Sequence, residues 1–463
     1  MADLSKACVG ILNSGSRPGS AISHSSPVDH ATVLPPINES KLVRKIDFRV
    51  LPILFIVYVV SFLDRVNMSN ALTLGLPEEL GLTGQQPNVA LAIFFIPFII
   101  FEIPSNLLLK RFRPRVWLSI CVLTFGVVTI GQGFVQSHSS LLVTRFLLGL
   151  AESGIFPGSF YLISFWYKRE EAQKRFTAYY SSTIVAGAFG GLLCSAIANL
   201  NGVRGLTSWR WVFILEGIVT VLAKWLSESE RQFLLKKTES NESHTVPVTS
   251  KDMVTFLSRA TNWLGALMYF SLSVPGFSVV YFVPSIVQGW GYNTLQTQLH
   301  SVPPFAAALG FTLVSAYLSD RLRLHSPFIF LALALLITGL AILLTIHGTK
   351  TFSVEYAAIC LTAMGSIGIG GHVVCWYVMN LQGHVERSLG SAWMICFGGI
   401  AGLVATFAFM KKEAPYYLTG YSLSLATASL CVVVHLCYGL LIWRDKRAMA
   451  RNGGGNPGRT LYL

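Results

Sequence analysis

The sequence between residues 50 and 71 reads VLPILFIVYVVSFLDRVNMSNA. This run is long enough to cross a bilayer as one α-helix, which takes about 20 predominantly apolar residues. Near its end, Asp64 and Arg65 interrupt the apolar residues, and Asn67 follows. A charge inside a bilayer is costly, so a membrane segment that keeps two charges indicates a functional site.

The composition of the whole chain also favours a membrane protein. Of its 463 residues, 52% are hydrophobic and 12% are charged, whereas soluble domains carry about 25% charged residues. At about 20 residues per crossing, this apolar content suffices for about twelve spans. The expected fold class is therefore an all-α polytopic membrane protein with two six-helix bundles.

Twelve apolar segments are expected to cross the membrane, in two groups of six separated by a polar stretch. They are residues 50–71, 89–109, 116–135, 141–166, 178–200 and 211–225, then 264–287, 302–318, 327–346, 354–379, 391–409 and 421–443. The sixth segment is unusually short, because Arg210 and Lys224 bound it closely and Glu216 lies between them.

The pattern predicts five regions along the chain. They are a disordered N-terminal tail (1–48), an N-terminal six-helix bundle (49–226), a linker (227–262), a C-terminal six-helix bundle (263–443) and a C-terminal tail (444–463). Lys and Arg cluster before the first span, in alternate loops and in the last region, which places both termini and the linker in the cytoplasm.

The net charge of +13 is thereby explained by the loops, so we expect no nucleic acid among the partners. The expected partners are the lipid bilayer, protons and a small anionic substrate, and we expect a monomeric multi-pass protein of the plasma membrane. We expect no enzyme, because HExxH, G-x-S-x-G and P-loop patterns are absent from the sequence. The eight cysteines form no CxxC pair, so no metal site or cofactor is expected.

Four charges lie inside the predicted spans, Asp64 and Arg65 in the first and Arg145 and Glu152 in the fourth. An arginine fork suits a carboxylate, and a carboxyl group in a medium of low dielectric constant can bind and release a proton near neutral pH. We interpret Asp64 and Glu152 as proton-coupling residues and Arg65 and Arg145 as substrate-binding residues. Ionised Glu152 would hold Arg145, and protonated Glu152 would release it to an anion. The alternative is that these charges only lock helices together.

Other polar residues are weaker candidates for the substrate site. Asn67 follows the charges of the first span, and His372, Trp376 and Asn380 recur at i, i+4 and i+8 in the tenth, so they share one helix face. We predict that these four residues bind substrate, and a packed polar seam between helices is the alternative. Glu102 is expected only to pair with a loop arginine near the cytoplasmic end of the second span.

Several motifs resemble one family. They are Leu63-Asp64-Arg65-Val66-Asn67, RFLLGLAESGIFPGSFYLISFWYKREE (145–171), GAFGGLL (187–193), WRWVFILEG (209–217) and SDRLR (319–323). Together they are similar to the fungal allantoate permease group, in the anion:cation symporter branch of the major facilitator superfamily. That resemblance implies a central cavity, alternating access, and coupling and anion recognition at the charges of the first and fourth helices. It also implies that Asp320, Arg321 and Arg323 gate the cavity, because Asn106 stands near the place of an acidic residue in the corresponding loop of the first half.

The function expected from these residues and this resemblance is secondary active transport, with proton-coupled symport of a small carboxylate such as a vitamin acid or ureide acid. Export of a secondary metabolite and nutrient sensing without transport are the alternatives. The sequence does not name the substrate, because fold and spans do not fix it.

Overall fold

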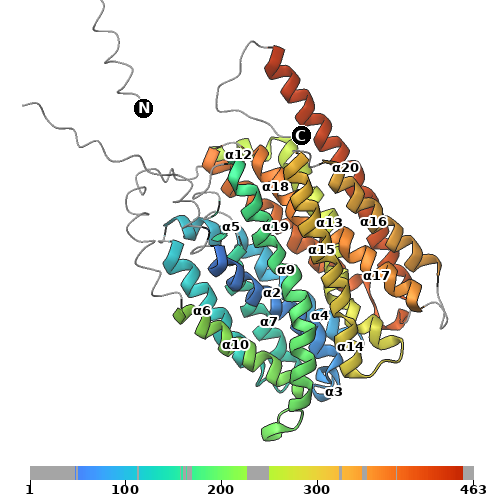
Figure 1. The fold of residues 1–463 in the computed structure, drawn as a ribbon. Coiled ribbons are helices and arrows are strands. Elements are labelled where there is room, and N and C mark those ends of the chain that lie inside the picture. The colour runs from blue at the N-terminus through green and yellow to red at the C-terminus, as the bar shows by residue number, and fades with distance from the viewer. Residues whose placement is uncertain are drawn as a thin grey trace, which may run out of the picture. The chain divides into compact units, whose positions relative to one another are not determined.

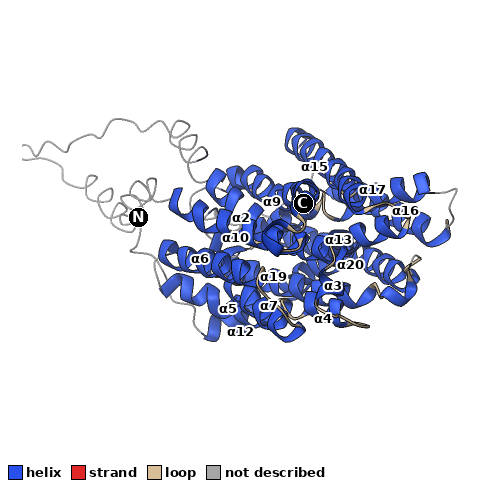
Figure 2. Cartoon of the chain, turned by 90° about the horizontal axis from the view of Figure 1, so that it is seen from below, coloured by secondary structure: helices blue, strands red, loops and turns tan. Residues whose placement is uncertain are grey.

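The computed structural model describes residues 47, 51–111, 114–156, 158–159, 163, 169–226, 250–322, 326–346, 352–381, 383–414 and 416–451. Within these ranges the ordered elements are helices joined by turns, and no strand occurs (Figure 2). Residues 1–46 and 452–463 and most of the predicted linker lie outside the described ranges.

The helices form two sequential sets (Figure 1). The first set is α2 (Leu51–Thr73), α3 (Leu76–Glu79), α4 (Gln86–Ala92), α5 (Phe95–Arg111), α6 (Pro114–Gln132), α7 (His138–Glu152), α9 (Arg169–Ile197) and α10 (Ser208–Leu226). The second set is α12 (Ser250–Leu257), α13 (Ala260–Gly289), α14 (Thr294–His300), α15 (Val302–Leu322), α16 (Ser326–Thr345), α17 (Phe352–Ser366), α18 (Gly370–Asn380), α19 (Gly383–Ala408) and α20 (Leu418–Arg451).

Nine helical stretches of the described residues are long and apolar enough to cross a membrane, and Val116–Gln132 is a shorter apolar helix. Three of the nine are made of two successive α-helices: α4 with α5, α14 with α15, and α17 with α18. Large apolar side chains such as Ile100, Val143 and Leu440 remain exposed on the outside of the bundle. Such an apolar exterior suits lipid, so the chain is a multi-pass membrane protein.

The two sets meet along α2 with α13, α5 with α19, and α9 with α15 and α18. The break between α17 and α18 lets α18 approach α9 closely. A Cβ atom at Gly370 would lie 2.1 Å from Oη of Tyr180, so a larger residue there would displace the Tyr180 ring. In Figure 1, α3 and α12 mark opposite ends of the bundle, which we call the α3 end and the α12 end.

Some helix bounds differ from those expected. The predicted sixth span corresponds to α10, which begins at Ser208 rather than at residue 211 and has 19 residues. At 1.5 Å per residue this is about 28 Å, although α10 is not among the nine stretches above. It gains this length because Arg210 is paired and lies inside the helix. At the other bounds, α12 and the start of α13 lie within the predicted linker, and α20 continues to Arg451, past the predicted end at residue 443.

Candidate functional site

The middle of α2 is enclosed by protein on every side. From residue 60 to residue 71 each side chain of this helix is buried. The helices α9, α10 and α13 pack on it, and side chains of α7 reach it. A helix with no lipid-facing side can carry polar residues at membrane depth if other helices supply their partners. The α2 residues Asp64, Arg65 and Asn67 are all buried here.

The first buried ion pair joins α2 to α7. Arg145 donates from Nη1 to Oδ2 of Asp64 at 2.7 Å, and the two side chains are 2% and 0% exposed. The Nε and Nη2 groups of Arg145 and Oδ1 of Asp64 have no hydrogen-bond partner among the described residues. The guanidinium group therefore uses one of its donors on Asp64 and keeps others for a further acceptor.

The second buried ion pair joins the same two helices. Arg65 Nη2 lies 3.0 Å from Oε1 of Glu152, which also accepts a hydrogen bond from Oγ of Ser61 at 2.7 Å. Four phenylalanine rings surround the Arg65 guanidinium group, with ring centres 4.9 to 6.0 Å from Cζ: Phe62, Phe94, Phe98 and Phe277. Phe277 belongs to α13, so Arg65 lies where the two sets of helices meet.

These pairings differ from the expected competition between Arg145 and Glu152. Residues seven apart in one helix are separated by about 10 Å along its axis, and each of these two finds a nearer partner on α2. Adjacent residues of a helix point about 100° apart, which lets Asp64 and Arg65 face different partners. The four predicted charges thus meet as two ion pairs, and their roles in coupling and binding stay predictions.

Glu216 joins this site, although the sequence reasoning did not place it there. Its Oε2 accepts a hydrogen bond from Nδ2 of Asn67 at 2.8 Å, and Oδ1 of Asn67 in turn lies 3.4 Å from Sγ of Cys194. The signal was present, because Glu216 is a carboxylate inside an apolar run, the same criterion that identified Asp64 and Glu152. It was treated only as a defect of a short span.

Glu102 is also buried more deeply than expected. Its side chain is 0% exposed and, among the described residues, neither carboxylate oxygen has a hydrogen-bond partner. The charges of Arg65 and Glu152 act on it. It therefore belongs with the buried charges of α2 and α7, rather than with a loop arginine.

The predicted residues of the tenth span lie in the second set of helices. Trp376 of α18 packs on the rings of His435 and Tyr438 in α20, with centroids 6.0 and 4.9 Å apart. Asn380 donates to the backbone oxygen of Trp376 at 2.9 Å, and His372 is 3% exposed. The contacts of Trp376 are aromatic packing between α18 and α20, and both substrate binding and a polar seam between helices stay predictions.

The predicted gating residues are only partly described. Arg321 is exposed in the last turn of α15, whereas Arg323 and the side chain of Asp320 lie outside the described residues. Asn106, near the end of α5, donates to the backbone oxygen of Ser388 in α19 at 2.9 Å. The two sets of helices are therefore joined on the α12 side of the charges.

The two sets are also joined toward the α3 end. Ser69 donates to the backbone oxygen of Tyr281, Gln298 donates to Oγ1 of Thr73 at 2.9 Å, and Asn88 donates to the backbone oxygen of Thr406 at 2.7 Å. Beyond these contacts lies a cavity of about 660 Å³, lined by residues of both sets, including Thr73, Asn88, Phe282 and Tyr417. Leu72, eight residues after Asp64, is the first α2 residue that lines the cavity, so the cavity begins about 12 Å along α2 from the charges.

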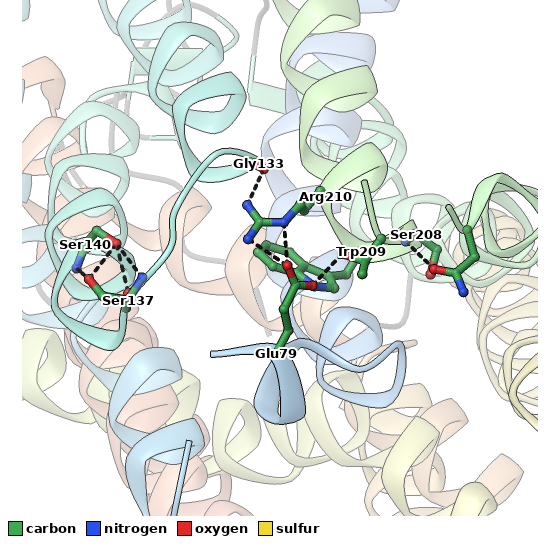
Figure 3. A network of polar contacts seen from close by, with 9 residues as sticks. Glu79, Gly133, Ser137, Ser140, Ser208, Trp209 and Arg210 are labelled. Atoms are coloured by element: carbon green, nitrogen blue, oxygen red, sulfur yellow. Dashed lines mark hydrogen bonds and ion pairs between the residues drawn. The ribbon is translucent and has the colours of Figure 1, made fainter. Parts of the chain in front are cut away.

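The start of α10 is held by a polar network around Glu79, which we call the Glu79 clamp (Figure 3). Glu79 accepts hydrogen bonds from Thr207 and from the indole of Trp209, both at 2.6 Å. Arg210 lies against the same carboxylate at 2.8 to 2.9 Å and donates to the backbone oxygen of Gly133 in the turn after α6 at 3.1 Å. Partial burial favours a raised pKa, but these hydrogen bonds and the charge of Arg210 together outweigh it and lower the pKa of Glu79.

The sequence matches a family model described as Major Facilitator Superfamily over residues 54–406. Among curated relatives, "MFS transporter prlL" of Fungal sp. (strain NRRL 50135) is 31% identical over 445 residues, covering 89% of this chain and 88% of that protein. The "High-affinity nicotinic acid transporter" of Saccharomyces cerevisiae is 29% identical over 413 residues, covering 84% of this chain and 75% of that protein.

The fold is similar to that of a solved structure, a bacterial homologue of the human lysosomal transporter Spinster in an inward-facing and occupied conformation. The TM-score is 0.62 at 16% identity, and the match covers 84% of this chain and 96% of that one. A likeness at this identity concerns the fold alone. Together with a family model that spans most of the sequence, it shows that the chain is a membrane transporter of the Major Facilitator Superfamily.

Proposed function

We propose that this transporter is a proton-coupled symporter of a small organic anion that carries a carboxylate. The observation that carries the proposal is the pair of buried contacts between α2 and α7, Arg145 with Asp64 and Arg65 with Glu152. Two full charge pairs at membrane depth are costly to retain for stability alone, and residues of this kind mark substrate and proton pathways.

Each ion pair contains the two groups that anion symport requires, an arginine to bind the anion and a carboxyl group to bind the proton. The arginine stays charged and can bind the carboxylate of a substrate through its planar fork. When the substrate anion takes the arginine, the displaced Asp64 or Glu152 loses its counter-ion in a medium of low dielectric constant. Binding a proton then restores neutrality, so the anion and the proton are taken up together.

Two observations favour a small aromatic carboxylate as the first substrate to test. The Arg65 guanidinium group lies among four phenylalanine rings, at 4.9 to 6.0 Å, so a bound carboxylate could place an aromatic ring against them. One relative is named as a nicotinic acid transporter. Nicotinate is therefore the probe we choose, as one member of the vitamin acids expected from the sequence.

The remaining expectations complete the proposal. The clusters of Lys and Arg in the sequence place the α12 end and both termini in the cytoplasm, which makes the cavity at the α3 end face outward, in the plasma membrane. The two ion pairs and Glu216 form what we call the charged layer: Asp64, Arg65, Arg145, Glu152 and Glu216. The two sets of helices rock about this charged layer in alternating access. His372, Trp376 and Asn380 complete the substrate site from the second set, Asp320, Arg321 and Arg323 gate the cytoplasmic side, and the protein acts as a monomer.

Uptake of radiolabelled nicotinate tests this proposal, in cells that lack their own permeases for it. Uptake should be faster in acidic than in neutral medium, and a protonophore should abolish accumulation. Glu152→Gln cannot exchange a proton, so it should exchange substrate across the membrane without accumulating it. Glu355→Gln makes the same change in α17, outside the charged layer, and should accumulate as the wild type does.

Accumulation by Glu152→Gln that still follows the pH gradient would show that Glu152 is not a coupling residue. Net efflux from preloaded cells with no uptake would favour export instead.

A further inference from the structure

Glu216 is a buried carboxyl group that belongs to neither ion pair of the site, and the proposed function gives it no role. It lies eight residues after Ser208, about 12 Å into α10, and its side chain is 2% exposed. Asn67 donates to its Oε2, and its Oε1 has no hydrogen-bond partner within the described ranges. The ion pairs found among the described side chains do not include Glu216.

The hydrogen bond to Asn67 places Glu216 beside Asp64. Residues three apart on a helix are neighbours on one face, so Asp64 and Asn67 present adjacent side chains toward α10. The titratable or charged groups that act on Glu216 come from three helices: Asp64 of α2, Arg145 and Glu152 of α7, and Cys194 of α9. The helix α6 also packs on α10, and the α6 residues Gly126 and Ile130 that face α10 there do not titrate.

The charges immediately around Arg145 do not balance if every group there is ionised. Arg145 is the one guanidinium group beside two carboxyl groups, and Asp64 occupies it at 2.7 Å. An ionised Glu216 would be buried without a cation, which is strongly unfavourable in a medium of low dielectric constant. Neutrality is restored if this pair of carboxyl groups holds one proton.

We propose that Glu216 is the proton donor to Asp64 during transport. This proposal rests on the proposed function and assigns a step within it. When a substrate anion takes Arg145, Asp64 loses its counter-ion. The O–H bond of Glu216 then breaks and an O–H bond forms on Asp64, and Glu216 regains a proton from the medium at the α3 end, which keeps the occupied layer neutral.

A purely structural role for Glu216 predicts a different pattern of variants. Gln at position 216 keeps an oxygen that accepts the hydrogen bond from Asn67 but carries no transferable proton. Asp keeps the proton but shortens the side chain, which weakens that hydrogen bond. A structural role therefore ranks Glu216→Gln above Glu216→Asp, whereas proton donation ranks Glu216→Asp above Glu216→Gln.

Transport of nicotinate in proteoliposomes with an imposed pH gradient tests the proposal. Glu216→Gln should lower the maximal rate by about tenfold or more, as expected for loss of a proton donor. The half-saturation concentration and exchange between equal internal and external nicotinate should stay near those of the wild type. Glu216→Asp should recover part of the rate, and Glu355→Gln in the other set of helices should leave it unchanged. A wild-type rate in Glu216→Gln together with impaired Glu216→Asp would overturn the proposal.

An infrared measurement without substrate separates this proposal from the proposed function. The wild type at neutral pH should show the carbonyl band of a protonated, buried carboxyl group, and Glu216→Gln should lack a component that Glu355→Gln retains. An identical band in wild type and Glu216→Gln would show that Glu216 holds no proton. Failure of the wild type to accumulate nicotinate or another small carboxylate would contradict the proposed function, while the band would still decide the protonation of Glu216.

Discussion

Arg145 contacts Asp64 through a single nitrogen and leaves two other N–H groups without protein acceptors among the described residues. A bidentate carboxylate uses two parallel N–H groups of one guanidinium fork. The geometry of Arg145 is therefore compatible with our proposal that a substrate carboxylate displaces Asp64 from it. Arg65, in contrast, lies over four phenylalanine rings, and cation–π interactions with these rings stabilise its guanidinium group.

We predict that Arg145→Lys weakens anion binding although it keeps the charge. Lysine offers a point charge in place of the planar fork, so the substrate loses one charge-assisted hydrogen bond. Such a bond is worth about 1.5 to 3 kcal/mol, so the half-saturation concentration for nicotinate should rise by roughly tenfold or more. Exchange kinetics in proteoliposomes measure this half-saturation concentration.

The matched control is Arg204→Lys, at an exposed turn before α10. Equal half-saturation concentrations in the two variants would show that the fork of Arg145 does not bind substrate.

At this scale the sequence identified four charges that lie buried in the bundle, but not how they pair. Asp64, Arg65, Arg145 and Glu152 were predictable because the cost of charge inside a membrane depends on residue type and depth, and both follow from the sequence. The partners depend on the rotation of α2 against α7, which a hydropathy pattern does not contain. Glu216 meets the same criterion, because it is a charged residue type inside an apolar run.

Among the helices, α10 shows best how tertiary contacts set the limits of a span. Treating Arg210 as the boundary of the sixth span was reasonable, because an unpaired arginine belongs outside the bilayer. Glu79 neutralises that arginine, so the helix starts earlier, at Ser208. Gly217 then lets α10 approach α6, since a Cβ atom there would lie 2.7 Å from the backbone oxygen of Gly126. The Glu79 clamp and this contact fix the position of Glu216, and neither partner is adjacent in sequence.

We predict that the Glu79 clamp stabilises the protein only above acidic pH. The pKa of Glu79 is lowered from the ordinary value of 4.5 by its hydrogen bonds and Arg210, which outweigh partial burial. A lowered pKa in the folded state means that the stabilisation is fully present above 4.5 and is lost as the pH falls through the folded pKa. Glu79→Gln should therefore unfold at a lower temperature than the wild type at neutral pH, and the difference should shrink as the pH falls below that value.

Tryptophan fluorescence in detergent follows this unfolding, because Trp209 is fully buried in the clamp. Glu78→Gln, on the same short helix but outside the clamp, should behave as the wild type does at each pH. A gap between Glu79→Gln and the wild type that stays constant on acidification would mean that the charge of Glu79 does not contribute to stability.

In the whole molecule, the charged layer lies between two groups of contacts that join the two sets of helices. Asn106 with Ser388 lies on the α12 side, and Asn88 with Thr406 lies on the α3 side, next to the cavity. That the chain folds as two successive sets of helices was predictable from the spacing of the apolar segments. Which ends are joined in this conformation was not, because these contacts use neutral side chains and backbone oxygens that carry no recognisable pattern.

We predict that a covalent link across the α3 side stops transport. Asn88 of α4 lies within 2.7 Å of the backbone of Thr406 in α19, so cysteines at these two positions should form a disulfide under mild oxidation. If the two sets of helices must separate here to admit substrate, cross-linked Asn88→Cys with Thr406→Cys should lose nearly all uptake, and reduction should restore it. Replacing the exposed Cys437 by serine removes a competing thiol, and protection of both cysteines from maleimide measures the extent of cross-linking.

Each single variant should transport with or without oxidant, since one cysteine cannot bridge the two sets of helices. Normal uptake by the fully cross-linked protein would mean that substrate enters without separation of α4 from α19, and that the cavity at the α3 end is not its entrance.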